Sequence, residues 1–201
     1  MKRAFTGNSM FLAQKLSGRM IFLLIAITGC FWQCQPTKKL NTDKVEVVDF
    51  PKDWLGEWEG NLEVFNAKGK SMELYMGLNI LPIENDRYTW TIIYGEGEKR
   101  QERKYELMPK DTAKGHYLID EKNSIILDDF LLGNTLYSRF EVMGNLLLIS
   151  YRLESETLNF EVVSGNLEPI NTTGGQDSIP IVNSYNIFVM QQAILKRKTK
   201  D

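Results

Sequence analysis

The stretch GEWEGNLEV, residues 56–64, decides the fold class of this chain. The residues of one parity are Trp58, Gly60, Leu62 and Val64, and polar residues fill the positions between them. Such strict alternation is typical of a β-strand that turns one face to a core and the other to water. The stretch therefore predicts a half-buried strand.

The same alternation recurs along most of the chain. It is clear over residues 72–80 and 88–94, and turn residues such as Glu84-Asn85-Asp86 separate the segments. The final segment, 186–196, is apolar on both sides, and its β-branched start favours a strand over a helix. Further strands are expected at 101–108, 115–120, 123–128, 132–142, 145–153 and 156–163, which makes about ten in all.

Strands that follow one another through short turns must pack as two sheets or close into a barrel. The hairpin spacing favours an all-β fold, an up-and-down antiparallel β-barrel of about 8–10 strands formed by residues 50–201. An outer-membrane barrel is excluded because its outward face must be a continuous apolar band, whereas here that face carries Glu57, Glu63 and Lys104.

Residues 1–29 have the pattern of a signal peptide. Basic residues and no acidic one precede an apolar run from Met20 to Thr28, which is too short to cross a bilayer. The run leads into Ile27-Thr28-Gly29-Cys30, which resembles the lipobox of bacterial lipoproteins. The alternative is an ordinary secretory signal with an incidental cysteine.

The lipoprotein resemblance implies a cellular location. In that family the lipobox cysteine is lipidated and becomes the first mature residue, so Cys30 is the expected lipidation site. Residues 30–49 are mostly polar and are expected to form a flexible tether. The resemblance implies a bacterial envelope protein that is anchored to a membrane through its N-terminal lipid, with the outer membrane as the default location.

The charge of the mature chain argues against nucleic acid as a partner. Without residues 1–29 the chain has 20 Lys and Arg against 26 Asp and Glu, a net charge of about −6. Such an excess repels phosphate backbones and anionic membrane surfaces. If Cys30 is lipidated, Cys34 is the single remaining thiol and no internal disulfide is expected.

Residues 50–60, FPKDWLGEWEG, resemble the opening of the calycin proteins, which include lipocalins and fatty-acid-binding proteins. In those families a turn leads into Gly-x-Trp on the first strand, here Gly56 and Trp58. The resemblance implies that Trp58 plugs one end of the barrel under a basic side chain from a late strand, for which Arg197 and Lys196 are the candidates. No second lipocalin motif is recognisable.

Nitrobindin-like haem barrels share the start Trp-Leu-Gly-x-Trp-x-Gly, which residues 54–60 match. In that family a histidine near the C-terminus binds the iron. The single histidine of this chain is His116, in the middle of the sequence. The haem role is therefore not implied, and no cofactor is expected.

The sequence offers little support for catalysis. A single histidine and the lack of Gly-x-Ser-x-Gly argue against a Ser-His-Asp hydrolase. His116 and Asp120 share a face of a predicted strand and, with Asp128, could supply three metal ligands. Residues 120–123 are explained more simply as a hairpin turn. We therefore expect neither a metal site nor an enzyme.

The residues expected to face the barrel interior indicate a ligand site. Arg103 shares a face with Tyr105 and Leu107, and an inward arginine is costly unless an anionic group meets it. Arg103 either binds the carboxylate of a ligand, or pairs with an internal glutamate or lies at the rim where water reaches it. The aromatic residues expected around the ligand are Tyr88, Trp90, Tyr94, Tyr105 and Tyr151, with Phe140 and Phe160.

Two functions follow from these patterns. The first is a lipid-anchored envelope protein that binds a small apolar or amphipathic ligand without catalysis, with Arg103 and tyrosine hydroxyls orienting the polar head. The second is an assembly module that binds an unidentified protein partner. In the second case aromatic side chains and methionines such as Met72 and Met76 fill the barrel.

Overall fold

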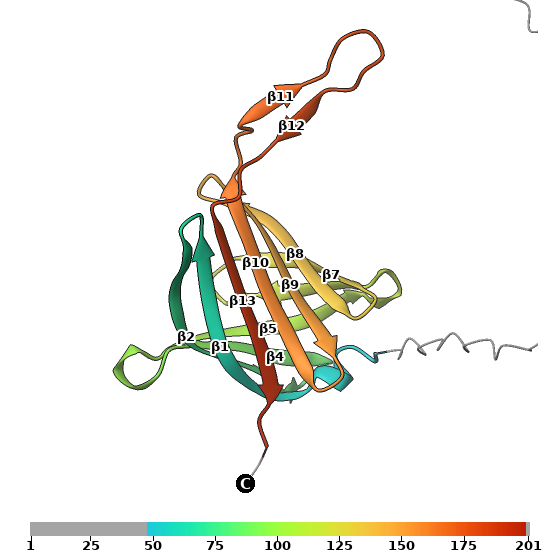
Figure 1. Cartoon of the computed structure of the whole chain (residues 1–201). Coiled ribbons are helices and arrows are strands. Elements are labelled where there is room, and N and C mark those ends of the chain that lie inside the picture. The colour runs from blue at the N-terminus through green and yellow to red at the C-terminus, as the bar shows by residue number, and fades with distance from the viewer. Residues whose placement is uncertain (1–47, 200–201) are drawn as a thin grey trace, which may run out of the picture. The chain divides into compact units, whose positions relative to one another are not determined.

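The computed structural model describes residues 48–199, which form an all-β structure (Figure 1). The expected signal peptide, Cys30 and most of the expected tether lie outside the described residues. Within residues 48–199, no helix has the length and apolar character needed to cross a membrane. The helices of this part are short 3-10 turns, η1 Lys52–Trp54, η2 Gly97–Lys99 and η3 Thr112–Lys114.

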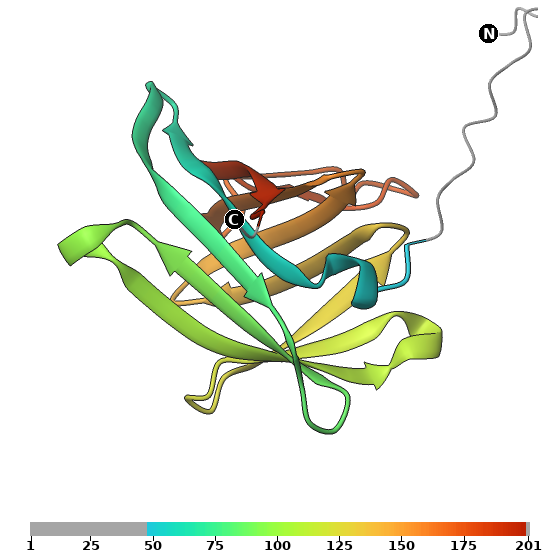
Figure 2. The ribbon, with the colours of Figure 1, turned by 90° about the horizontal axis from the view of Figure 1, so that it is seen from below.

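Ten antiparallel strands form a closed barrel. Neighbours in the chain pair with one another, β2 pairs with β4, and β13 pairs with β1 to complete the ring. Figure 2 shows these strands curving around a common interior. The predicted fold class is confirmed. The barrel strands are β1 Gly56–Asn66, β2 Gly69–Ile80, β4 Arg87–Tyr94, β5 Gln101–Asp111, β6 His116–Asp120, β7 Ile126–Leu132, β8 Thr135–Val142, β9 Asn145–Glu154, β10 Thr157–Asn166 and β13 Val189–Arg197, and the short β3 Pro82–Ile83 pairs with β4.

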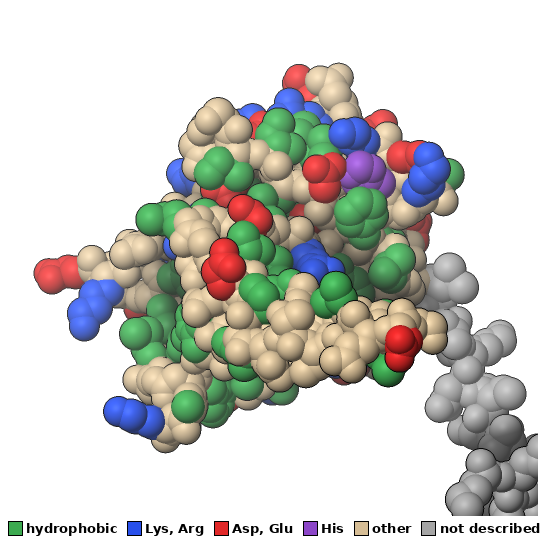
Figure 3. Space-filling view, turned by 90° about the horizontal axis from the view of Figure 1, so that it is seen from above, with side chains coloured by type: hydrophobic (Ala, Val, Ile, Leu, Met, Phe, Trp, Pro, Cys, Tyr) green, Lys and Arg blue, Asp and Glu red, His purple; other side chains and the backbone are tan. Residues whose placement is uncertain are grey.

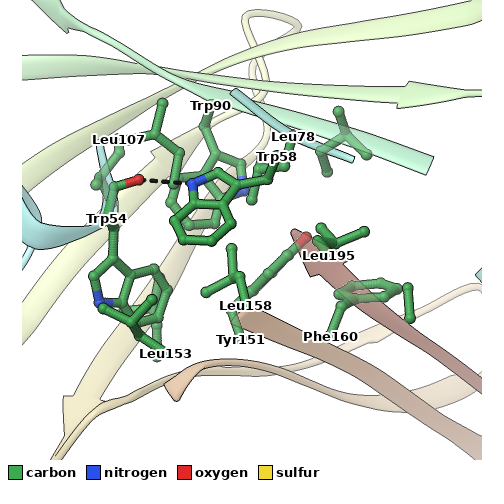
Figure 4. Packing of buried hydrophobic residues seen from close by; sticks show 14 of the residues in the cluster. Trp54, Trp58, Leu78, Trp90, Leu107, Tyr151, Leu153, Leu158, Phe160 and Leu195 are labelled. Atoms are coloured by element: carbon green, nitrogen blue, oxygen red, sulfur yellow. Dashed lines mark hydrogen bonds between the residues drawn. The ribbon is translucent and has the colours of Figure 1, made fainter. Parts of the chain in front are cut away.

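One end of the barrel is closed by buried aromatic and aliphatic side chains (Figure 4). Trp58 on β1 is 1% exposed, and its indole N–H donates to the backbone oxygen of Trp54 in η1, 2.9 Å away. Leu158 from β10 and Leu195 from β13 are fully buried in the same cluster. The first and last strands therefore share one core, and burial of each large apolar side chain contributes about 1.5–3 kcal/mol to folding.

The segment between β10 and β13 forms a separate hairpin. β11 Asn171–Thr173 and β12 Val182–Ser184 pair with each other and with none of the described barrel strands. Figure 1 shows this hairpin extending away from the barrel at the end opposite η1. Its apolar side chains lie in solvent, with exposed fractions between 61% and 70% for Ile170, Ile179, Ile181 and Ile187.

Three strands begin three residues later than predicted. They are β7, β8 and β13, which were expected at 123–128, 132–142 and 186–196. The loop before β7 is held by the Asp120 carboxylate, which accepts a hydrogen bond from the backbone N–H of Lys122 at 2.8 Å. The β7–β8 turn lies at Gly133, whose φ of 63° is in the left-handed region that favours glycine.

Gly60 is needed where β1 passes β13. A Cβ at this position would lie 2.4 Å from the backbone oxygen of Ile194, which is closer than such atoms approach in proteins. We expect Gly60→Ala to push the two strands apart and to lower the free energy of unfolding by about 1–3 kcal/mol, measured by urea denaturation. Asn61→Ala, on the outer face one residue later, should change it by less than about 0.5 kcal/mol. Equal losses in the two variants would contradict this account.

Candidate ligand-binding cavity

A cavity of about 940 Å³ lies inside the barrel, and every barrel strand contributes to its lining. Its rim includes Val64 and Met72, on either side of the β1–β2 turn, and Val142 at the end of β8. Met72 is 57% exposed there, whereas Met76, further along β2, is fully buried in the core. Figure 3 views the molecule from this end and shows hydrophobic side chains gathered in the middle of the face.

Six of the seven aromatic residues predicted around a ligand line this cavity, namely Trp90, Tyr94, Tyr105, Phe140, Tyr151 and Phe160. The rings of Trp90 and Tyr151 meet edge to face, with centroids 5.1 Å apart, and both residues are buried. Tyr88 is placed elsewhere and does not line the cavity. It lies at the start of β4, where it packs against the buried core close to the closed end. Tyr88 and Tyr94 share a face of β4 but lie at opposite ends of the strand.

Arg103 lies at the edge of the cavity, near the start of β5. Its guanidinium carbon is 5.2 Å from the centroid of the Tyr94 ring, which is a cation–π contact. The residue is exposed to water, and it forms no ion pair with any other residue between 48 and 199. Within the described part of the chain, Arg103 thus does not pair with an internal glutamate, which was one of the alternatives. It lies at the rim, where water reaches it.

The tyrosine hydroxyls of the cavity are hydrogen-bond donors at neutral pH. Burial raises the pKa of Tyr105, Glu121 raises it further, and Arg103 acts in the opposite direction. Burial also raises the pKa of Tyr94, and it raises the pKa of Tyr151 well above the usual value. The phenols therefore stay protonated, and their O–H groups can donate to polar atoms of a bound molecule.

The cavity also contains a buried acidic group, Asp129, that no sequence pattern indicates. Asp129 on β7 is 3% exposed, and its cross-strand neighbour on β8, Ser138, is 5% exposed. Neither Asp129 Oδ1 nor Ser138 Oγ has a hydrogen-bond partner among residues 48–199. Burial raises the pKa of Asp129 to about 7, the Ser138 hydroxyl opposes this shift, and the charge of Asp128 adds to it. A buried carboxyl with a raised pKa in the wall of a cavity is a candidate functional group.

Asp129 is hard to find in the sequence because both faces of β7 look alike. One parity of the strand is Ile126, Asp128, Phe130 and Leu132, and the other is Leu127, Asp129 and Leu131. Each face carries one aspartate among apolar residues. The exposed fractions of 54% for Ile126, 43% for Phe130 and 63% for Leu132 show that the first set faces solvent.

The three residues weighed as metal ligands do not form a metal site. His116 Nε2 and Asp128 Oδ1 are 2.6 Å apart, and the imidazole stacks on the ring of Phe130, with centroids 4.7 Å apart. Asp120 instead forms an ion pair with Lys122, at 3.5 Å. Residues 48–199 contain no group of three or more His, Cys, Asp or Glu side chains placed to hold a metal ion.

The residues of the Gly-x-Trp resemblance meet at the closed end. The Arg197 guanidinium lies over the ring of Trp58, 4.1 Å from its centroid. It also donates to two backbone oxygens of the segment before β1, one of which is that of Asp53 at 2.9 Å. A Cβ at Gly56 would come within 2.9 Å of this guanidinium. Of the two basic candidates, Arg197 is thus the one over the tryptophan, and Lys196 is exposed.

Several solved structures resemble this fold. A protein of unknown function from the DUF3598 family of Nostoc punctiforme matches with a TM-score of 0.51 and 15% identity, over 73% of this chain and 48% of that one. This chain therefore spans about half the length of that protein. The S-type phycobiliprotein lyase CPES from Guillardia theta matches with a TM-score of 0.52 and 7% identity, over 73% of this chain and 89% of that one. No protein-family model and no curated protein matches the sequence.

The likeness concerns the fold and corrects one expectation. At 15% and 7% identity the likeness shows a shared fold, and it assigns no functional residues to this chain. The sequence predicted a protein that is not an enzyme. That expectation is contradicted, because the lyase that shares this barrel fold is an enzyme. The barrel alone does not separate binding from catalysis, since one fold hosts many activities.

Proposed function

We propose that the barrel binds a small apolar or amphipathic molecule whose anionic group lies near Arg103. The observation that carries the proposal is the cavity of about 940 Å³. Ligand sites are usually mostly apolar clefts of about 300–1,000 Å³ with a few polar groups. Among the described residues that line the cavity, Arg103 is the one basic side chain. Such a lining suits a long apolar body with an acidic head.

A filled barrel that acts only through its outer surface is the weaker alternative. Met76 and Leu107 do fill the closed end, since both are fully buried. The cavity begins beyond them, and its wall carries the unpartnered polar atoms of Asp129 and Ser138. A barrel selected only to be solid would place apolar side chains there, because a buried polar atom without a partner costs about 1–3 kcal/mol.

The proposal also includes a location and a range of ligands. The lipobox resemblance at Cys30 supports anchoring of the barrel to a membrane of the bacterial envelope by an N-terminal lipid. The likeness to a phycobiliprotein lyase adds a bilin pigment to the candidate ligands. Fatty acids and bilins both combine an extended apolar body with carboxylates, so Arg103 serves either class.

We expect Arg103→Ala to weaken binding of cis-parinaric acid, a fluorescent fatty acid, by about tenfold or more. The variant lacks a charge-assisted hydrogen bond to the carboxylate, and such a bond contributes about 1.5–3 kcal/mol. The methyl ester of the same probe has no carboxylate for Arg103 to bind, so the wild type and the variant should bind it equally well. The measurement is a fluorescence titration of the full chain with each probe.

Lys104→Ala is the matched control, because Lys104 is the next residue on β5 and its side chain is 77% exposed. This variant should bind both probes like the wild type. Equal binding of the acid by wild type and Arg103→Ala would remove the role of Arg103 and leave the cavity in place. If the wild type binds neither probe and does not bind biliverdin, the proposed function is wrong.

A further inference from the structure

Asp129 and Ser138 form a polar pair within the wall of the cavity. They are directly opposite each other on β7 and β8, and both line the cavity while remaining at least nine-tenths buried. A carboxylate and a hydroxyl in this position normally find partners in the protein, because a buried acceptor without one is costly. Asp129 Oδ1 and Ser138 Oγ have no such partner among residues 48–199.

The surroundings of the pair supply no cation. Among the described residues, three acidic side chains line the cavity, Glu121, Asp129 and Glu141, and one basic side chain, Arg103. Arg103 makes no ion pair with Asp129 in the described structure. Tyr151, on β9, lies near enough for the charge of Asp129 to act on its phenol. The interior therefore presents an unmatched acceptor well inside the barrel, whereas its basic group lies at the rim.

We propose that Asp129 and Ser138 bind a nitrogen-borne donor of the ligand, an amine or an N–H group, in the interior of the barrel. The inference rests on the proposed function, because it needs a molecule in the cavity. One N–H of the ligand nitrogen would donate to Asp129 Oδ1, and a second N–H of the same nitrogen would donate to Ser138 Oγ. A plain fatty acid would lay methylene groups against both atoms and leave them without partners.

The inference defines the ligand class more narrowly than the cavity does. The molecule carries an acidic group for Arg103 at the rim and a nitrogen donor for Asp129 deeper in the barrel. Selection by a hydrogen-bonding site is strong, because an analogue that lacks the donor leaves buried polar groups unpaired. The pair thus discriminates against simple lipids of the same length and charge.

The test compares dodecanoate with 12-aminododecanoate, measured by displacement of cis-parinaric acid from the full chain at pH 8. The carboxyl of Asp129, with a pKa raised to about 7, is mostly ionised at this pH, and the amine is protonated. The wild type should bind the amino acid more tightly than dodecanoate, although an ammonium group would weaken binding in a purely apolar cavity. Asp129→Asn should weaken binding of 12-aminododecanoate by about tenfold or more and leave that of dodecanoate unchanged or tighter.

Two further variants keep the test decisive. Asp128→Asn makes the same chemical change on the outer face of β7, where the side chain is 58% exposed, and should leave both affinities unchanged. Ser138→Ala should also weaken the binding of 12-aminododecanoate. The test therefore does not depend on the correct folding of a single variant. If dodecanoate binds and Asp129→Asn leaves the affinity for 12-aminododecanoate intact, the inference is overturned while the proposed function stands. If neither dodecanoate nor 12-aminododecanoate binds the wild type, the inference is overturned, and the proposed function is overturned with it only if cis-parinaric acid and biliverdin also fail to bind.

Discussion

Replacement of Trp58 by alanine is expected to lower the free energy of unfolding by about 3–5 kcal/mol, the usual cost of removing a large aromatic side chain from a core. Trp58 is 1% exposed, and its N–H bond to the Trp54 oxygen, at 2.9 Å, connects β1 to η1. The Arg197 guanidinium, 4.1 Å above the ring, loses its cation–π partner in the variant. Urea denaturation followed by far-ultraviolet circular dichroism measures the loss without relying on tryptophan fluorescence.

Two companion variants separate packing from the polar contacts of Trp58. Trp58→Phe keeps much of the apolar volume but removes the N–H donor, and it should cost about 1–3 kcal/mol because the Trp54 oxygen is left buried without its partner. Ile194→Ala, on the outer face of β13 where the side chain is 64% exposed, should change stability by less than about 0.5 kcal/mol. A loss below about 1 kcal/mol for Trp58→Ala would show that this residue does not hold the closed end together.

Asp129→Asn is expected to stabilise the ligand-free protein above neutral pH. The folded state raises the pKa of this carboxyl from 3.8 to about 7, so the folded protein binds the proton more tightly than the unfolded chain. The free energy of unfolding therefore falls as the pH rises from about 4 to about 7, and then levels off. The full shift corresponds to about 4 kcal/mol. Asparagine has no proton to lose, so this part of the pH dependence should vanish and the variant should exceed the wild type by a few kcal/mol at pH 8.

The measurement is urea denaturation of both proteins at several values between pH 4 and pH 9. Asp128→Asn again serves as the control, because it makes the same chemical change at a neighbouring side chain that is 58% exposed. Parallel stability curves for the wild type and Asp129→Asn would mean that the carboxyl is not desolvated in the folded protein. Gain of stability together with loss of amine binding would fit a site that sacrifices stability for recognition.

The barrel was predictable because alternation is kept on most of its strands. Met76, Leu78 and Ile80 on β2 are all fully buried, as their common parity requires. The hairpin β11–β12 was not predictable by the same rule. Ile179 and Ile181 are apolar but lie in solvent, so no buried face produces a period along the hairpin.

The candidate site was predictable only in part, because parity assigns a residue to a face and carries no information about depth along the barrel axis. Tyr94 and Tyr105 share the predicted face and line the cavity, whereas Tyr88 shares it and lies at the closed end. Arg103 was placed on the inner side, but its position at the rim depends on where β5 begins. Asp129 was hidden for a different reason, since Asp128 beside it gives the two faces of β7 the same pattern.

The pairing of β1 with β13 also constrains when the protein can fold during its synthesis. Trp58 is opposite Arg197, so the residue that covers the tryptophan leaves the ribosome long after the tryptophan itself. Until β13 has been made, one edge of β1 has unpaired backbone N–H and C=O groups, which are a template for pairing with another chain. Contacts between residues so distant in sequence also form slowly. The nascent chain is thus exposed to wrong partners until β13 has been made, and protection of the first barrel strand matters more than protection of any later one.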